Sequence, residues 1–350
     1  MRKAEVLSAL EIGYRAFDTA QNEAWGYKES DVGEAIEESF VDRKDVFVQT
    51  KISPYNYKRN LRDSIESSFR NLRTSYIDSI ILHTADSGWK EAYRVLEEYV
   101  AESRVHRIGV SNFDRETLLE LIEFAKVRPS VVQNWNDVLH QDTLVRAICA
   151  EHGITYQAYS SLGNQWFRRL RMSQTKAFVK RPFVSNLETL RSIASSHQKD
   201  VPELVYRWQM QSNIAVIATS RDPVRQRENL ESLRDESFEL SPNEMAEIDR
   251  MDGKVNEVIQ MRRVSFWNHD VHRILDVFWF DREANNLIWK GGIEPNRSMD
   301  MISYVGHVFV LKSRSEEDKS DGAYQQNLTV ADEPLHQRMD WNGSLSREEL

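Results

Sequence analysis

Residues that can move protons or hold a carbonyl group stand at the ends of four short apolar segments of this chain. Asp18 ends the first segment, Lys51 the second, His83 the third, and Ser111 with Asn112 the fourth. Sequence with helical periodicity lies between them. Because the carboxyl ends of parallel strands in a barrel meet on one face, these side chains are expected to converge in one pocket.

An aspartate, a lysine, a histidine and a nearby tyrosine can together donate a proton to a carbonyl oxygen. Tyrosine alone is a weak acid, with a reference pKa of about 10. A lysine ammonium beside it favours the phenolate, and an aspartate holds the lysine in place. A histidine can orient the carbonyl or share the proton. Reduction of the carbonyl also needs a hydride, which no side chain supplies, so the chemistry requires a cofactor.

The segments that would position these residues alternate between strand and helix from residue 1 to about 254, which predicts an α/β domain with a parallel sheet and helices outside it. The helix Thr143–His152 is expected to have Asp142 as its N-cap. Only seven strands are found, and none precedes the first helix, so the prediction is a (β/α)8 TIM barrel that is N-terminally incomplete. The predicted strands are Tyr14–Thr19, Val46–Lys51, Ile77–His83, Arg107–Ser111, Val131–Asn134, Thr155–Ser160 and Ile214–Thr219.

The pattern changes after residue 254. Val264–Asn268, Ile274–Asp281 and Ser303–Lys312 are rich in β-branched and aromatic residues, with turn signals between them. They predict a small all-β sandwich domain over residues 258–335. The polar segment 336–350 is expected to be a disordered tail.

Composition excludes several classes of function. The 350 residues carry a net charge of −9, which argues against a nucleic-acid partner. No apolar run is long enough to span a membrane. The single cysteine, Cys149, excludes an intrachain disulfide and fits a cytoplasmic location. No His/Cys cluster has the spacing of metal ligands, so no metal is expected.

Residues 1–254 resemble the aldo-keto reductase family. The family has a (β/α)8 barrel and transfers hydride from NADPH to aldehydes or ketones. The resemblance implies an NAD(P)H-dependent oxidoreductase that acts on a small carbonyl substrate. The matching segments, in order along the chain, are Gly13–Ala20, Gln49–Lys51, Asp78–His83, Ile108–Phe113, Val132–Asn134, Tyr159–Ser160 and Val216–Asn229.

The resemblance places Asp18, Lys51 and His83 at three of the four catalytic positions of that family. The fourth position, a tyrosine five residues after the aspartate, is Glu23 in this chain. The segment that begins at Tyr27 resembles the family's Tyr-x-x-Glu-x-x-Val-Gly region with one residue fewer. Some family members have a longer loop before this tyrosine, so Tyr27 is the predicted proton donor.

The resemblance also implies cofactor-binding positions at both ends of the dinucleotide. Thr219 stands where the family has a lysine for the 2′-phosphate, and Asp222 adds a negative charge close by. The resemblance implies NADPH as the cofactor, and these two residues leave NADH as the alternative. The residues implied at the nicotinamide end are Ser111, Asn112, Gln133, Tyr159 and Ser160, and those at the adenosine end are Ser220, Arg225, Glu228 and Asn229.

Residues 258–335 resemble the β domain of the von Hippel–Lindau tumour suppressor family. The stretch Ile302–Phe309 is similar to that family's Ser-Tyr-x-Gly-His-x-Trp strand, whose serine and histidine bind a hydroxyproline hydroxyl in a partner peptide above an aromatic floor. Alternation along one strand is expected to place Ser303, His307 and Phe309 on one side, unless a bulge at Gly306 intervenes. The peptide-binding candidates are Ser303, Tyr304, His307 and Phe309.

Three interpretations follow. The favoured one is an NAD(P)H-dependent oxidoreductase that reduces an aldehyde or ketone to an alcohol, with a C-terminal module that binds a peptide partner. The alternative is a catalytically weak barrel scaffold whose β domain recognises a hydroxyproline-containing peptide. The third is an incomplete product whose open sheet edge causes aggregation. Each candidate residue taken alone also has a structural explanation, such as a turn aspartate or a hydrogen-bonded histidine.

Overall fold

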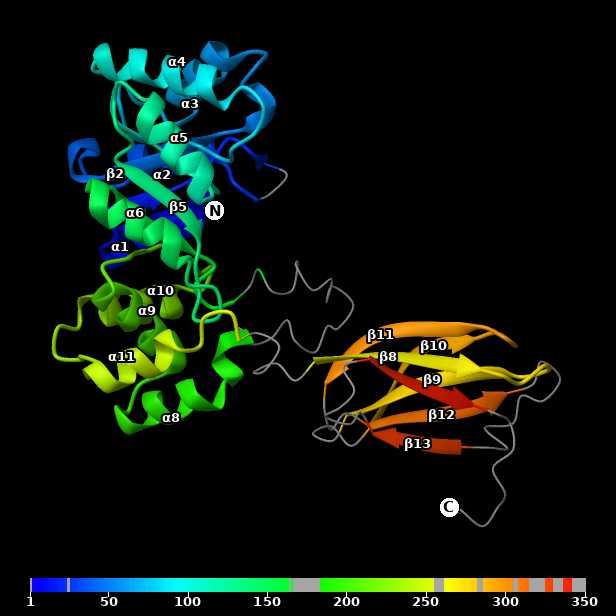
Figure 1. The fold of residues 1–350 in the computed structure, drawn as a ribbon. Helices are drawn as coiled ribbons and strands as arrows, with labels where there is room; N and C mark the ends of the chain where they lie inside the picture. The colour runs from blue at the N-terminus through cyan, green and yellow to red at the C-terminus, as the bar shows by residue number, and fades with distance from the viewer. Residues whose placement is uncertain are drawn as a thin grey trace. The chain divides into compact units, whose positions relative to one another are not determined.

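The structure is a computed structural model that describes residues 2–23, 26–163, 165, 183–254, 261–281, 286–304, 308–314, 325–329 and 336–341. The chain divides into two compact units, Met1–Gly253 and Lys254–Leu350 (Figure 1). In the part of the chain that is described, no helix combines the length and the apolar character needed to cross a membrane.

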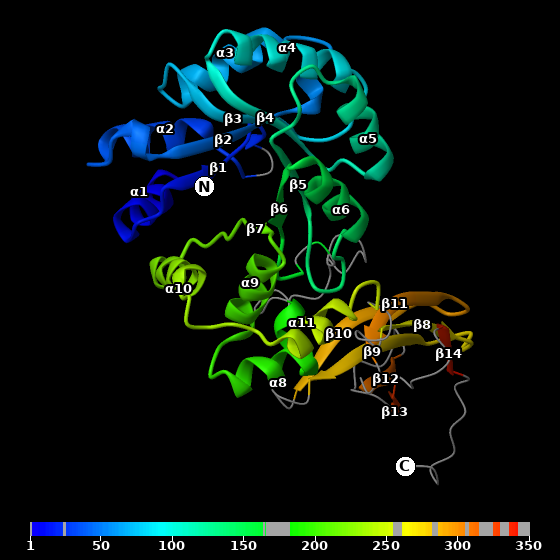
Figure 2. The same cartoon turned by 60° about the vertical axis from the view of Figure 1, so that its left-hand side comes forward.

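The first unit is built on one parallel sheet of seven strands, hydrogen-bonded in the order β1 to β7 (Figure 2). The prediction of seven parallel strands is therefore confirmed, as a barrel-like sheet whose edges are β1 and β7. The strands are β1 (Ala16–Asp18), β2 (Phe47–Ile52), β3 (Ile77–Leu82), β4 (Val105–Ser111), β5 (Val131–Trp135), β6 (Thr155–Tyr159) and β7 (Ala215–Val216).

Helices connect these strands, and α3, α4 and α5 lie outside β3 and β4 (Figure 2). Their apolar faces supply the core, as Ile65 and Phe69 do on α3 and Tyr93 and Leu96 on α4. The helices are α1 (Lys3–Ile12), α2 (Glu29–Glu38), α3 (Leu61–Asn71), α4 (Trp89–Ala101), α5 (Arg115–Phe124), α6 (Thr143–His152), α8 (Glu188–Ser196), α9 (Val201–Gln211), α10 (Pro223–Arg234) and α11 (Pro242–Asp249), with short 3₁₀ turns η2 (Arg43–Asp45), η3 (Pro54–Asn56) and η5 (Phe183–Asn186).

Helix α2 packs directly on the backbone at the end of α3. A Cβ atom on Gly33 would lie 2.4 Å from the carbonyl oxygen of Asn71, so only glycine allows this approach. The contact holds α2, which begins two residues after Tyr27, against the end of α3.

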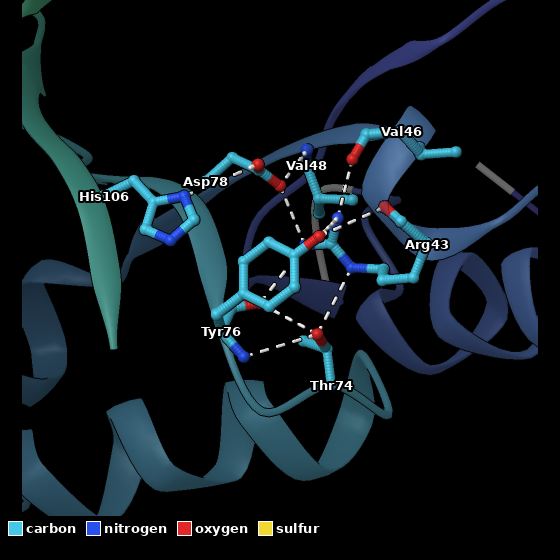
Figure 3. Close-up of polar contacts among 7 residues, drawn as sticks. All are labelled: Arg43, Val46, Val48, Thr74, Tyr76, Asp78 and His106. Atoms are coloured by element: carbon cyan, nitrogen blue, oxygen red, sulfur yellow. Dashed lines mark hydrogen bonds and ion pairs between the residues drawn. The ribbon is translucent and has the colours of Figure 1, made fainter. Parts of the chain in front are cut away.

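A polar cluster at the amino ends of β2, β3 and β4 is centred on Arg43 (Figure 3). Its Nη2 lies 2.8 Å from Oδ2 of Asp78, and the same oxygen accepts the backbone N–H of Val48 at 3.0 Å. The guanidinium lies over the ring of Tyr76, 4.3 Å from its centroid, and the imidazole of His106 stacks on that ring at 4.9 Å between centroids. The cluster therefore joins η2 to three strands.

Asp142 is the N-cap residue of α6, as the sequence predicted, but its side chain is used elsewhere. Asp142 stands at the N-cap position with a left-handed φ of 51°, and its side chain makes no capping bond. Its Oδ2 instead accepts hydrogen bonds from Asn134 Nδ2 at 2.9 Å and from Tyr156 Oη at 2.8 Å. Two buried donors from β5 and β6 compete for the carboxylate more effectively than the helix end does.

The second unit contains two β-sheets, so its predicted β-rich character is confirmed. One hydrophobic cluster includes residues of both sheets, and Phe266 lies 5.0 Å from Phe309 between ring centroids. The antiparallel sheet has the order β10 (Asn286–Ile293), β9 (Ile274–Asp281), β12 (Val308–Arg314) and β13 (Gln325–Thr329), and the other sheet has the order β11 (Ser298–Tyr304), β8 (Met261–Asn268) and β14 (His336–Trp341).

Two predictions for this unit need correction. The single strand predicted over Ser303–Lys312 is two strands in different sheets, since β11 ends at Tyr304 and β12 begins at Val308. The alternation that was expected to place Ser303, His307 and Phe309 on one side therefore does not apply. His307 lies outside the described residues, as do the side chains of Ser303 and Tyr304.

The expected tail from residue 336 also differs in part. His336–Trp341 forms β14, which pairs in parallel with β8. Strand pairing with β8 gives this polar segment the hydrogen-bond partners that its composition alone did not indicate. Residues 342–350 lie outside the described residues.

Candidate active site

Strands β1 and β2 bring Asp18 and Lys51 together at their carboxyl ends. Oδ2 of Asp18 lies 2.5 Å from Nζ of Lys51, which also donates to the backbone oxygen of Thr19 at 3.0 Å. The side chain of Lys51 is only 1% exposed. A cation this deeply buried needs compensating partners, and the carboxylate and the carbonyl supply them.

Tyr27 lies beside this ion pair. The Lys51 ammonium is 5.0 Å from the centroid of the Tyr27 ring. The ring also meets His83 edge to face, at 6.0 Å between centroids and 77° between planes. Glu23, at the family's usual tyrosine position, is exposed. The structure thus brings Asp18, Tyr27, Lys51 and His83 into one group.

A buried carboxylate anchors the segment that carries Tyr27. Glu29 is 4% exposed. Its Oε1 accepts the hydroxyl of Thr50 at 2.6 Å, and its Oε2 accepts from Asn71 Nδ2 at 3.1 Å. Since Thr50 directly precedes Lys51, Glu29 ties the start of α2 to the strand that carries the lysine.

His83 follows the last residue of β3 and is buried. Burial is the main cause that lowers its pKa, to about 4, and the nearby Lys51 adds to it, while Asp18 acts in the opposite direction. The imidazole is therefore neutral near pH 7. A neutral imidazole has one ring N–H with which to donate to a carbonyl oxygen.

The ends of β4, β5 and β6 meet around Asn112. Its φ of 57° turns the chain just after β4, and its backbone N–H donates to the carbonyl oxygen of Gln133 at 3.1 Å. Its Nδ2 donates to the carbonyl oxygen of His83 at 2.8 Å, and its Oδ1 accepts from Tyr159 Oη at 2.6 Å. Ser160, which follows β6, also has a positive φ of 57°. These side chains therefore share the end of the sheet that holds Asp18 and Lys51.

The donors and acceptors left here fit a primary carboxamide, such as that of nicotinamide. Gln133 uses Nε2 to donate to Asp18 Oδ1 at 3.0 Å, while its Oε1 accepts no hydrogen bond from a described residue. The Ser111 hydroxyl accepts from Asn112 Nδ2 at 3.1 Å and donates to no described atom. A carboxamide needs one acceptor and one donor, and Gln133 and Ser111 offer one of each.

The residues assigned to the adenosine end lie just before α10 and along its first seven residues. Asp222 is the N-cap of this helix and accepts from the backbone N–H of Val224 at 2.9 Å. Nε of Arg225 lies 3.8 Å from Oδ2 of Asp222, so the aspartate charge has a cation beside it. Arg225 and Glu228 are exposed, whereas Ser220 and Asn229 are half-buried. The exposed pair is open to a phosphate or ribose group.

Over the described ranges, no group of three or more His, Cys, Asp or Glu side chains could hold a metal ion.

The chain matches the model of the "Aldo/keto reductase family" over residues 2–252. A 9,11-endoperoxide prostaglandin H2 reductase of Trypanosoma cruzi is 33% identical over 246 residues, which are 69% of this chain and 80% of that protein. An NAD(P)H-dependent D-xylose reductase of Scheffersomyces stipitis is 29% identical over 281 residues, which are 71% of this chain and 85% of that protein.

Solved structures agree with these relatives. The crystal structure of an aldo-keto reductase enzyme from a Medee basin deep-sea metagenome library has a TM-score of 0.62 and 31% identity, and the match covers 72% of this chain and 86% of that one. A Brucella melitensis aldo/keto reductase has a TM-score of 0.61 and 30% identity, with 71% and 89% covered. The chain therefore belongs to the aldo/keto reductase family.

Proposed function

We propose that this chain is an NAD(P)H-dependent carbonyl reductase that converts an aldehyde or ketone to an alcohol. The observation that carries the proposal is the buried Asp18–Lys51 pair, with Tyr27 and a neutral His83 beside it. Relatives named as NAD(P)H-dependent reductases support the choice of cofactor.

In this proposal Tyr27 donates its proton to the carbonyl oxygen of the substrate. The cofactor, when bound, supplies the hydride that reaches the carbonyl carbon. The Lys51 ammonium stabilises the phenolate that forms as Tyr27 gives up its proton, and Asp18 holds the ammonium in place. His83 donates a hydrogen bond that orients the substrate oxygen.

The cofactor is proposed to lie across the carboxyl ends of β4 to β7. Ser111, Asn112 and Gln133 hold the carboxamide, Tyr159 packs on the ring, and Ser160 lies next to it along the chain. Ser220, Arg225, Glu228 and Asn229 form the adenosine end. Arg225 lies beside Asp222 and offsets its charge, which favours NADPH over NADH despite Thr219.

A titration with NADPH and with NADH, followed by quenching of tryptophan fluorescence, tests the cofactor part of this proposal. Saturable binding of NADPH, tighter than that of NADH, is expected. The failure of both nucleotides to bind at millimolar concentration would overturn the reductase function for this chain.

The second unit is proposed to be a two-sheet sandwich of the von Hippel–Lindau β-domain type. The shared cluster of Val264, Phe266, Leu275, Phe309 and Leu311 supports this fold. A peptide pocket floored by Phe309 is not favoured, because that ring is 2% exposed and packs on Phe266. The cytoplasmic location and the lack of a nucleic-acid partner stay predictions from composition.

A further inference from the structure

Three glutamine side chains surround the side of Asp18 that faces away from Lys51. Gln49 and Gln133 both donate from Nε2 to Oδ1 of Asp18, at 2.9 and 3.0 Å. The same two nitrogens also donate to Oε1 of Gln157, at 2.8 and 3.2 Å. Gln49, Gln133 and Gln157, here termed the amide clamp, thus form a closed ring of hydrogen bonds with the carboxylate.

The clamp lies on the inner face of the sheet. Gln133 pairs in register with Gln157, and Gln49 pairs with Ser79, so each pair of side chains points to the same side. Gln49 and Gln133 are each 2% exposed, and Ser79 is fully buried. Both ends of the Gln49 amide have hydrogen-bond partners, so turning this buried amide over would leave a polar atom without one.

The chemistry of the groups fixes how each amide is turned. An ionised carboxylate only accepts hydrogen bonds, so Gln49 and Gln133 must present their NH₂ groups to Asp18. Gln157 must then present its oxygen to both. The Ser79 hydroxyl donates to Oε1 of Gln49 at 2.9 Å, which agrees with the same orientation. The orientation of all three amides thus follows from the carboxylate acceptor at Asp18.

The clamp also determines which carboxylate oxygen is left for the lysine. Oδ1 receives two amide donors and Oδ2 receives the ammonium, so the plane of the carboxylate is fixed from both sides. We propose that Gln49 and Gln157 are positioning residues that hold Asp18 with Oδ2 toward Lys51, and through Lys51 keep Tyr27 able to donate its proton. This inference rests on the proposed reductase function.

The first test replaces Gln49 by methionine, which has a similar length and no hydrogen-bonding amide. In Gln49→Met, kcat for carbonyl reduction is expected to fall by about 10- to 100-fold, because a small misplacement of a catalytic group has a cost of that size. KM and the Kd for NADPH are expected to stay within about threefold of wild type. Gln157→Met serves as a second variant if Gln49→Met does not fold.

Gln141→Met is the matched control. Gln141 is also 2% exposed, and its Nε2 donates to the backbone oxygens of Val138 and Ile248 rather than to Asp18. It is expected to lose stability while keeping kcat. Equal losses of kcat in Gln141→Met and Gln49→Met, or an unchanged kcat in a folded Gln49→Met, would overturn the positioning role.

A double-mutant cycle on stability tests the interaction between the amide clamp and Asp18 independently of activity. Urea unfolding is compared for wild type, Gln49→Met, Asp18→Asn and the double variant. A hydrogen bond to a charged acceptor is stronger than one to a neutral acceptor. The factor by which Gln49→Met raises the equilibrium constant for unfolding is therefore expected to be about threefold smaller when Asp18 is already replaced by asparagine. If the effects of Gln49→Met and Asp18→Asn on the free energy of unfolding simply add, the proposed interaction between the amide clamp and Asp18 is contradicted. If wild type reduces no carbonyl, the proposed function fails, and this cycle alone decides whether the amides hold Asp18.

Discussion

An aspartate, a basic residue, a tyrosine and a histidine lie together at each end of strands β2 and β3, in different surroundings. At the carboxyl end, Asp18 pairs with Lys51 beside Tyr27 and His83. At the amino end, Asp78 pairs with Arg43 beside Tyr76 and His106 (Figure 3). Residue type alone therefore does not separate a reactive site from a structural one.

The two ends of the strands differ in how deeply their side chains are buried and in which groups their basic residues bind. Lys51 is 1% exposed and His83 is 7% exposed, whereas His106 is 52% exposed. The guanidinium of Arg43 is held by the backbone oxygens of Val46 and Tyr76 as well as by Asp78. Arg43 thus links separate segments of the chain, while Lys51 is a desolvated charge next to the phenol ring of Tyr27.

The largest effect is expected from removing the cation at the carboxyl end. Lys51→Met should lower kcat by about 10³-fold or more, because Tyr27 loses the charge that stabilises its phenolate. Steady-state reduction of an aldehyde measures kcat, and a nucleotide titration checks that cofactor binding persists. A kcat of Lys51→Met within tenfold of wild type would contradict a catalytic role for the carboxyl ends of the strands.

The converse change is expected to affect stability and not turnover. Arg43→Met breaks a partly buried ion pair and should lower the free energy of unfolding by about 1–3 kcal/mol. Urea unfolding measures this loss, and kcat at 25 °C should match wild type. Arg107→Met, which removes an exposed arginine that forms no ion pair with a described residue, is the control and should leave stability nearly unchanged.

The two histidines should differ in how they couple stability to pH. Burial and Lys51 lower the pKa of His83 to about 4, below the usual value of 6.5. The unfolded chain therefore binds this proton more tightly, and stability should fall by about 2 kcal/mol as the pH drops from about 6.5 to about 4. Urea unfolding at pH 7 and pH 4.5 measures the loss. His83→Gln should remove this part of the pH dependence, and His106→Gln should retain it.

The smallest effect is expected at the start of α10. Asp222→Asn removes an exposed negative charge beside the proposed 2′-phosphate position and should tighten NADPH binding about two- to fivefold relative to NADH. Fluorescence titration measures both dissociation constants. Glu231→Gln, an exposed change on the same helix, should not alter their ratio. An equal shift in both variants would point to net charge rather than to Asp222.

The residues at the strand ends could be predicted because a short stretch of sequence identifies each of them. An apolar run that stops at Asp18 or Lys51 marks both the strand and the residue that its carboxyl end presents. Tyr27 needed the family resemblance as well, since its distance from Asp18 departs from the family's usual spacing. The structure places all three in one group with His83.

Contacts between distant segments could not be predicted from local patterns. Gln49 and Gln157 are 108 residues apart, and nothing in either segment signals their hydrogen bond. Asp142 has the local signature of a helix cap, yet Asn134 and Tyr156 take its carboxylate. The run Ser303–Lys312 has continuous β-propensity, but propensity does not mark where the chain passes from one sheet to the other.

The most direct test of the account compares wild type with Tyr27→Phe in the NADPH-dependent reduction of a panel of aldehydes and ketones. We expect turnover by wild type and a fall in kcat of about 10²- to 10⁴-fold in Tyr27→Phe, with NADPH affinity unchanged. Tyr55→Phe, at an exposed tyrosine, is the control and should keep full activity. Equal turnover by wild type and Tyr27→Phe would contradict the assignment of Tyr27 as the proton donor, and with it the proposed active site.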